Sequence, residues 1–210
     1  MRFPATDMME VETGQPGAYT GTLMNSTAEL VARVRGGDEE AFRLIFDRYS
    51  RPLLSFVYDM VGERELAEDL TQETFVRAYK GLAGLRDEAR LSTWLFSIAK
   101  NVARESLRTR RRHSGHVEID DEETVFEPHD ERPTPSAELL DKELSGVIQK
   151  ALLKLDEDKR LVFTLKIFQQ RSYEEIAEIT GFSIGKLKTD LHRARAEMRR
   201  RIGPYLGGEQ

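Results

Sequence analysis

Residues 172–202 constrain the fold of this 210-residue chain more than any other stretch. Ser172 is followed three residues later by Glu175, a spacing that predicts the start of a helix, because each side chain can bond to the backbone N–H of the other residue. Gly181 predicts a sharp turn with positive φ, which glycine adopts without steric cost. Ser183 then predicts the cap of a second helix. We therefore expect two helices joined by a tight turn.

The second helix of this pair is predicted to be apolar on one side and cationic on the other. Ile184, Leu187 and Leu191 recur at spacings of three and four and are expected to face inward. Residues 184–201 contain seven Lys or Arg and two acids. This pattern is typical of a helix-turn-helix, whose second helix reaches base edges while nearby cations hold phosphates. An ordinary amphipathic helix with a solvated basic face is the alternative interpretation.

The composition excludes several kinds of site. The chain has no cysteine, which excludes disulfides and thiolate chemistry and is typical of a reducing cytoplasm. No apolar run is long enough for a signal peptide or a membrane span. None of the four histidines has a metal-ligand spacing, and no phosphate loop or nucleophile elbow is present. We therefore expect a cytoplasmic protein with no metal, no cofactor, no direct membrane insertion and no catalytic residues.

Helical periodicity divides the chain into two small all-α domains. We expect residues 1–25 to be a disordered extension, with Met24 as an alternative natural start. We assign the first domain to residues 26–112, an acidic flexible linker to 113–135, the second domain to 136–204 and a tail to 205–210. Residues 117–131 hold eight acids and no Lys or Arg, which is typical of a solvated tether.

The first domain is expected to contain four helices. Asp38 is predicted to cap the second helix, and Pro52 to kink or interrupt it. The third helix is predicted over residues 63–80 and the fourth over residues 92–112. Residues expected to be buried are Ala41, Phe42, Ile45, Phe46 and Tyr49 in the second helix, Leu66, Leu70, Phe75, Ala78 and Tyr79 in the third, and Leu95, Ile98 and Val102 in the fourth. Trp94 is expected in this core, with a role as a stacking platform as the alternative.

The third helix presents a polar stripe on the side opposite its apolar residues. Asp69, Gln72, Glu73 and Val76 recur at spacings of three and four and share one face. A polar stripe with one apolar residue suits a moderately wet protein interface. A plain solvated helix face has the same periodicity, so both interpretations are open on the residues alone.

Three stretches in this order resemble bacterial sigma factors of the small, extracytoplasmic-function (ECF) type. They are DLTQETFVRAY at 69–79, STWLFSIAKNVARESLRTRRR at 92–112 and the helix-turn-helix ending in LKTDLHRARAEM. The resemblance implies that the first domain is sigma region 2 and the second is region 4. It further implies a factor that binds core RNA polymerase, directs promoter-specific transcription initiation and is controlled by an anti-sigma factor, which could tether it at the inner membrane.

The same resemblance implies the residues that make these contacts. The polymerase-binding set is Asp69, Gln72, Glu73 and Val76. The set for recognition and melting of the minus-ten element is Lys100, Asn101, Arg104, Arg108 and Arg111. The set for the minus-thirty-five element is Ser183, Lys186, Lys188, Thr189, His192, Arg193 and Arg195.

The chain departs from the family pattern at two positions. Asp190 stands where an arginine is common, and it is expected to pair with Arg193 or Lys186 or to accept from a cytosine amino group. Asp156 stands where the family usually has proline, and we expect it to cap the following helix. The resemblance also implies that the acidic linker threads through the polymerase toward the catalytic cleft.

Two other classes of protein are compatible with parts of the sequence. A stand-alone helix-turn-helix regulator would sense a ligand or dimerise through its first domain, but it would not need seven Lys or Arg and one acid at residues 90–112. An enzyme such as a nuclease or phosphotransferase would need a catalytic constellation, and the sequence offers none. The net charge of −5 argues against nucleic-acid binding only if it is spread evenly, and here it is not.

Overall fold

The computed structural model describes residues 26–113 and 135–206, except for the side chains of residues 135–142 and 206. Every regular element within these ranges is a helix. In chain order they are α1 (Thr27–Arg35), α2 (Glu39–Val61), α3 (Arg64–Gly81), two 3₁₀ turns (Leu82–Gly84 and Glu88–Arg90), α4 (Leu91–His113), α5 (Pro135–Leu153), α6 (Glu157–Phe163), a π turn (Thr164–Phe168), α7 (Tyr173–Thr180) and α8 (Ile184–Leu206). The predicted N-terminal extension, most of the acidic linker and the last residues of the tail lie outside the described residues.

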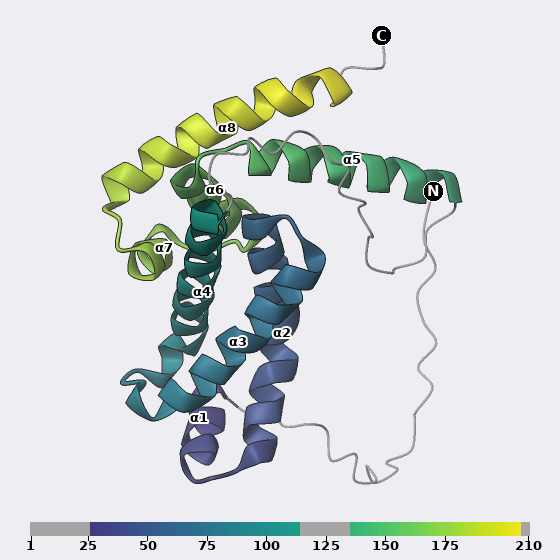
Figure 1. Ribbon diagram of the computed structural model, residues 1–210. Coiled ribbons are helices and arrows are strands. Elements are labelled where there is room, and N and C mark those ends of the chain that lie inside the picture. The colour runs from purple at the N-terminus through teal and green to yellow at the C-terminus, as the bar shows by residue number, and fades with distance from the viewer. Residues whose placement is uncertain (1–25, 114–134, 207–210) are drawn as a thin grey trace, which may run out of the picture.

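Helices α1 to α4 form a bundle around a shared core (Figure 1). The predicted cap of α2 is confirmed, because Asp38 Oδ1 accepts from the N–H of Ala41 at 3.1 Å. Gly62 ends α2 with a φ of 80°, in the left-handed region that glycine adopts readily. Phe56 of α2 and Phe96 of α4 meet inside the bundle, with ring centroids 5.3 Å apart.

The expected interruption at Pro52 is absent, and α2 runs through this residue. A proline inside a helix costs roughly 3 kcal/mol, because it removes one backbone hydrogen bond and crowds the preceding turn. Leu53, Phe56 and Val57 beyond it are completely buried. Their packing offsets the local cost, so tertiary contacts override the propensity of the proline.

The predicted helix-turn-helix is formed by α7 and α8. The capping box is confirmed: Ser172 Oγ accepts from the N–H of Glu175 at 3.1 Å, and Glu175 Oε2 accepts from the N–H of Ser172 at 2.8 Å. Gly181 follows α7 with a φ of 76°. Leu187 is buried as expected, but Ile184 is 40% exposed, so its predicted inward position is wrong. Ile184 is the first residue of α8 and lies at the turn, where the helix has not yet met the core.

The N-terminal and C-terminal helices pack against each other in the described part of the chain. Helix α4 contacts α7, and α2 contacts α5 and the π turn. Gln149 of α5 donates to the carbonyl of Tyr58 at 3.1 Å, and Arg160 of α6 donates to the carbonyl of Met60 at 2.6 Å. Figure 1 shows α5 and α8 lying across the end of the bundle that is opposite α1. The two groups of helices therefore form one compact body.

Candidate functional site

The polar stripe predicted on α3 is exposed along its whole length. Asp69, Gln72, Glu73 and Val76 all face solvent. The opposite side of α3 is buried through two alanines, one phenylalanine and two threonines. The hydroxyls of Thr71 and Thr74 donate to backbone carbonyls one turn earlier at 2.7 Å. Glu73 pairs with Arg77 at 2.7 Å, and Arg77 also reaches Glu105 of α4 at 2.8 Å. The stripe is thus a solvent-facing surface backed by a tightly packed helix.

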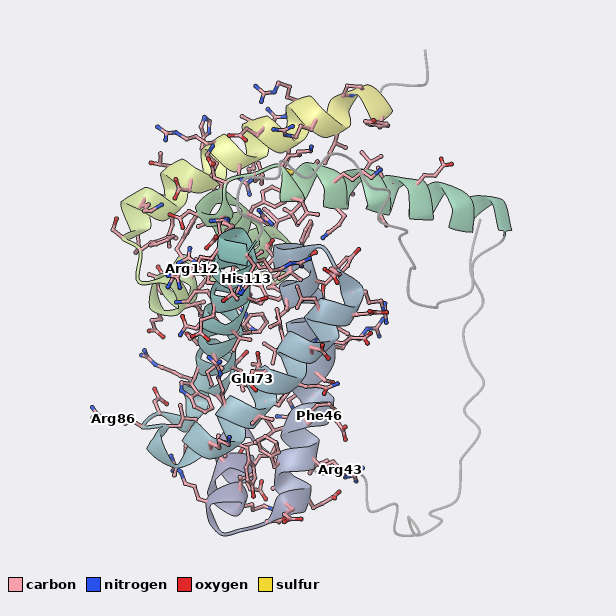
Figure 2. The ribbon with its side chains drawn as sticks, in the orientation of Figure 1. Arg43, Phe46, Glu73, Arg86, Arg112 and His113 are labelled. Carbon is pink, nitrogen blue, oxygen red and sulfur yellow. The ribbon has the colours of Figure 1, made fainter. Side chains whose placement is uncertain are left out.

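An exposed aromatic patch adjoins this stripe. Phe46 is 40% exposed, Val76 45% and Tyr79 53%. Phe46 lies 4.7 Å from Phe75 and Phe42 lies 4.9 Å from Tyr79, measured between ring centroids. Figure 2 shows Phe46 on α2 and Glu73 on the neighbouring α3. Together these residues make a surface with both carboxylates and aromatic rings.

The burial predicted for Phe46 and Tyr79 is therefore wrong. Ala41, Ala67 and Ala78 are completely buried in α2 and α3. Because alanines let two helix backbones approach closely, the bulky aromatic side chains at the edge of the contact are left at its rim. Periodicity identified the helices correctly but could not place the edge of the buried stripe.

The cationic face predicted on α4 divides into exposed and covered residues. Asn101, Arg108 and Arg111 are exposed, whereas Lys100 and Arg104 are half-buried. Lys100 Nζ donates to the carbonyl of Ile179 at 2.7 Å, at the C-terminal end of α7. Burial lowers the pKa of Lys100, and the positive charge of Arg104 lowers it further.

Acidic residues of α6 hold the cations of α4. Arg104 Nε lies 2.9 Å from Glu157 Oε1, and Arg104 Nη2 lies 2.6 Å from Asp158 Oδ1. Arg111 Nη2 lies 3.0 Å from Glu157 Oε2. These pairs join α4 to the start of α6, so part of the set predicted on α4 lies against the second group of helices.

The second helix of the helix-turn-helix presents most of its predicted residues to solvent. Ser183, Lys188, Thr189, His192, Arg193 and Arg195 are exposed. Ser183 Oγ accepts from the N–H of Lys186 at 3.3 Å, and Thr189 Oγ1 donates to the carbonyl of Gly185 at 3.0 Å. This exposed cationic face has the form that a DNA major groove accepts.

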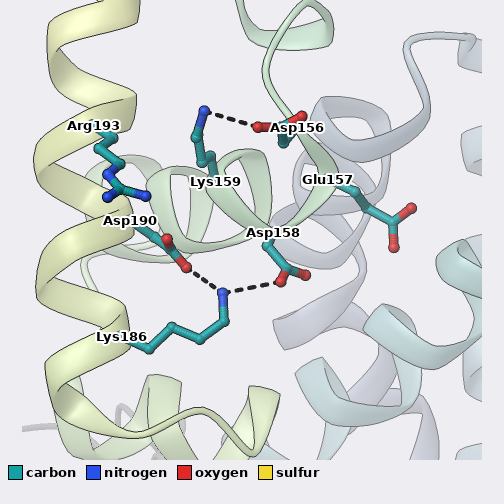
Figure 3. A pocket seen from close by; sticks show the side chains of 7 residues that line it. All are labelled: Asp156, Glu157, Asp158, Lys159, Lys186, Asp190 and Arg193. Atoms are coloured by element: carbon teal, nitrogen blue, oxygen red, sulfur yellow. Dashed lines mark hydrogen bonds and ion pairs between the residues drawn. The ribbon is translucent and has the colours of Figure 1, made fainter.

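Lys186 is the exception, because two carboxylates hold it (Figure 3). Its Nζ lies 2.5 Å from Asp190 Oδ2 and 3.0 Å from Asp158 Oδ2, beside a hollow of about 480 Å³ between α6 and α8. The hydrogen bond to Asp190, and next the one to Asp158, raise the pKa of Lys186. Asp190 is itself 8% exposed, so of the alternatives the sequence left open, the structure has the pair with Lys186.

Asp156 occupies the cap position of α6 without acting as predicted. The helix begins after it, but its side chain makes no capping hydrogen bond. Instead Asp156 Oδ2 lies 2.8 Å from Lys159 Nζ, which also pairs with Glu197 of α8 at 2.5 Å. The expected helix start is confirmed and the expected cap is wrong.

Both groups of helices match known protein families. The chain matches the family models for Sigma-70 region 2 over residues 45–113 and Sigma-70 region 4 over residues 145–198. It is 30% identical over 182 residues to the RNA polymerase sigma-H factor of Pseudomonas aeruginosa, covering 85% of this chain and 94% of that protein. It is 31% identical over 183 residues to the ECF RNA polymerase sigma-E factor of Haemophilus influenzae, covering 84% and 95%. The chain belongs to the ECF sigma factors.

Solved structures of sigma factors have the same fold as this sigma factor. The sigma factor RpoE in complex with the anti-sigma factor NepR from Bartonella quintana is similar with a TM-score of 0.65 and 25% identity, covering 77% of this chain and 96% of that chain. CnrH in complex with the cytosolic domain of CnrY is similar with a TM-score of 0.61 and 24% identity, covering 88% and 99%. The all-α prediction and the sigma factor resemblance are confirmed.

Two aromatic residues near the start of α4 in this sigma factor pack in or against the core. Trp94 is half-buried against the core, and a Cβ at Gly81 would lie 3.2 Å from its ring. Phe96, which periodicity did not single out, is completely buried. The structure agrees with the core interpretation of Trp94.

The described part of this sigma factor contains no cluster of three or more potential metal ligands. None of its described helices combines the length and hydropathy that a membrane span needs. Sigma factors are transcription initiation factors.

Proposed function

We propose that this sigma factor binds core RNA polymerase through the exposed face of α3. The observation that carries the proposal is that Asp69, Gln72 and Glu73 lie in an exposed row beside the exposed rings of Phe46 and Tyr79. Aromatic anchors within a polar rim are typical of protein interfaces, where a few such residues supply most of the binding energy. An exposed apolar patch with polar neighbours marks such a contact.

The exposed face of α8 is proposed to read the minus-thirty-five element. Lys188, Arg193 and Arg195 provide phosphate contacts, and the early residues Ser183 and Thr189 lie where a recognition helix reaches base edges. The buried carboxylate of Asp190 orients Lys186 and has no direct role in reading bases.

The cationic face of α4 is proposed to hold the opened minus-ten element. Unpairing and unstacking cost a few kcal/mol for each flipped base. Stacking and cationic contacts with the single strand offset this cost. Asn101, Arg104 and Arg108 supply hydrogen bonds and positive charge on one side of the helix, so binding energy replaces any ATP-driven step.

The proposed region boundaries, localisation and control of this protein are those expected of an ECF sigma factor. Region 2 is assigned to residues 26–112 and region 4 to residues 136–204, flanking the acidic linker. The factor contributes no catalysis of its own and acts in the cytoplasm. Its similarity to RpoE, which is bound to the anti-sigma factor NepR, supports control by an anti-sigma factor, through which tethering at the inner membrane would follow.

The experiment that tests the proposal is co-elution of the full chain with purified bacterial core RNA polymerase. The variant Asp69→Ala/Gln72→Ala/Glu73→Ala is expected to lose affinity by about tenfold or more, because it removes the charged row of the interface. A matched control, Glu29→Ala/Glu174→Ala, removes two exposed carboxylates elsewhere and is expected to bind as the unmodified chain does. Equal binding by all three proteins would show that the polymerase uses another surface.

A further inference from the structure

The first turn of α8 has almost no apolar packing of its own. Ile184 is 40% exposed, and a Cβ at Gly185 would meet open space, so neither residue packs against the core. Leu187 is the first completely buried apolar side chain of this helix. The turn nevertheless lies between Ser183 and Thr189, which the proposed function places at base edges. Its position therefore matters for reading the minus-thirty-five element.

The side chain of Lys186 links this turn to three surrounding groups (Figure 3). Its Nζ lies 3.0 Å from Asp158 Oδ2 at the start of α6 and 2.5 Å from Asp190 Oδ2 one turn further along α8. Nζ also lies 4.2 Å from the ring centroid of Phe182, in the connection between α7 and α8. A lysine ammonium has three N–H donors. Two carboxylates and an aromatic face are enough to engage all three of them.

The burial of Asp190 makes this arrangement costly to break. Asp190 is 8% exposed, and Lys186 is the cation paired with it. Removal of one partner of a buried ion pair leaves the other charge uncompensated, which destabilises a protein far more than loss of a surface pair does. The side chain of Lys186 is itself 39% exposed, so the constraint on its position comes mainly from the buried acid.

Lys188, two residues further along α8, has a different environment. Its side chain is exposed, and its Nζ lies 5.8 Å from the ring centroid of Tyr173. Within the described residues, no carboxylate pairs with it. An aromatic ring attracts a cation without neutralising its charge. Lys188 can therefore neutralise a DNA phosphate, whereas the charge of Lys186 is already balanced within the protein.

We propose that Lys186 is a positioning residue of the recognition helix α8 and not a DNA contact. Its two ion pairs and its ring contact set the place of the first turn of α8 on α6 and on the preceding connection. Ser183 and Thr189 then reach base edges from a fixed start of the helix. The inference rests on the proposed function of α8, and it removes Lys186 from the contact set that the sigma factor resemblance implies.

A positioning residue and a phosphate contact predict different losses of DNA binding. Loss of a phosphate contact weakens binding to every duplex alike and lowers the slope of log K against log salt by about one. Loss of a positioning residue weakens only the binding that depends on base edges. It leaves the salt slope unchanged, because no phosphate contact is removed.

The test measures binding of the full chain to two duplexes over a range of salt concentrations. The unmodified chain selects one duplex from a random pool, and the other is a scrambled sequence of equal length and composition. Lys186→Met keeps the length of the side chain and removes its charge. It is expected to lower affinity for the selected duplex about tenfold, as loss of one base contact does, with affinity for the scrambled duplex and the salt slope unchanged. Lys188→Met is the matched comparison, expected to weaken binding of both duplexes and to lower the slope by about one.

Thermal unfolding tests the ion pairs without DNA. Lys186→Met is expected to lower the melting temperature by about 4 °C or more, because it leaves a buried carboxylate unpaired. Lys186→Met/Asp190→Leu is expected to recover part of this loss, and its salt slope serves for the DNA measurement if Lys186→Met alone does not fold. Lys186→Arg keeps a cation beside both carboxylates and is expected to retain the melting temperature and the preference for the selected duplex. Lys154→Met, which replaces an exposed lysine just after α5, is expected to change neither.

The outcomes separate this inference from the proposed function. Equal losses of affinity for both duplexes by Lys186→Met, together with a smaller salt slope, would make Lys186 a phosphate contact and overturn the inference. A melting temperature that Lys186→Met does not change would overturn it as well. If the unmodified chain enriches no duplex, or if Lys188→Met leaves the slope unchanged, the proposed role of α8 fails. The melting temperatures then decide by themselves whether Lys186 holds the helix.

Discussion

Asp59 of α2 is a buried carboxyl, and its replacement by asparagine tests how burial sets the stability of region 2. The residue is 8% exposed, and its Oδ2 has no hydrogen-bond partner in the described part of the chain. Burial disfavours the charged form and raises the pKa of this carboxyl from 3.8 to about 7.

Because folding raises the pKa of Asp59, the free energy of unfolding decreases as the pH rises. Between about pH 4 and pH 7 the folded chain retains a proton that the unfolded chain has released, so stability is greatest at the acidic end and falls as pH rises through the folded-state pKa. One pKa unit corresponds to about 1.4 kcal/mol, so ionisation of Asp59 costs roughly 4 kcal/mol of unfolding free energy at about pH 8.

The assay is urea unfolding followed by circular dichroism over this pH range. Asp59→Asn keeps the shape of the side chain and removes its titration, so the difference in unfolding free energy between variant and unmodified chain is expected to change by roughly 4 kcal/mol in favour of the variant from about pH 4 to pH 8. Asp47→Asn, an exposed acid of the same helix, is the control. A difference that does not vary with pH would refute the reasoning and mean that a water molecule or a partner group solvates the ionised carboxylate.

Two further predictions concern α8 and the end of α2. Lys188→Ala and Arg193→Ala are each expected to weaken binding of duplex promoter DNA and to lower the slope of log K against log salt by about one, and an unchanged slope would mean that these residues do not touch phosphates. Gly62→Ala is expected to lower the unfolding free energy by about 1–2 kcal/mol in urea titrations, because alanine is strained at positive φ and its Cβ would lie 2.4 Å from a methyl carbon of Leu153. Gly84→Ala, which meets open space, is the control, and an equal effect there would contradict the steric argument.

Local sequence signals predicted the helices and their ends well, and tertiary packing explains the exceptions. The cap at Asp38, the capping box at Ser172 and the turn at Gly181 depend on residues three or four positions apart, which any helix brings together. The exposure of Phe46 and the continuity of α2 through Pro52 depend instead on what neighbouring helices cover. No pattern within one helix contains that information.

The sequence by itself determined an all-α chain with sigma factor motifs in order and a cationic second helix in its helix-turn-helix. Only the tertiary structure decided which cationic side chains of α4 and α8 are exposed to solvent and which are paired with acids. Arg104 and Asp158 are 54 residues apart in the chain, and their contact exists because α4 packs against the helices of region 4. The 3.6-residue period of a helix predicts which residues share a face. It does not predict which segment covers that face, because this depends on how segments distant in the sequence pack.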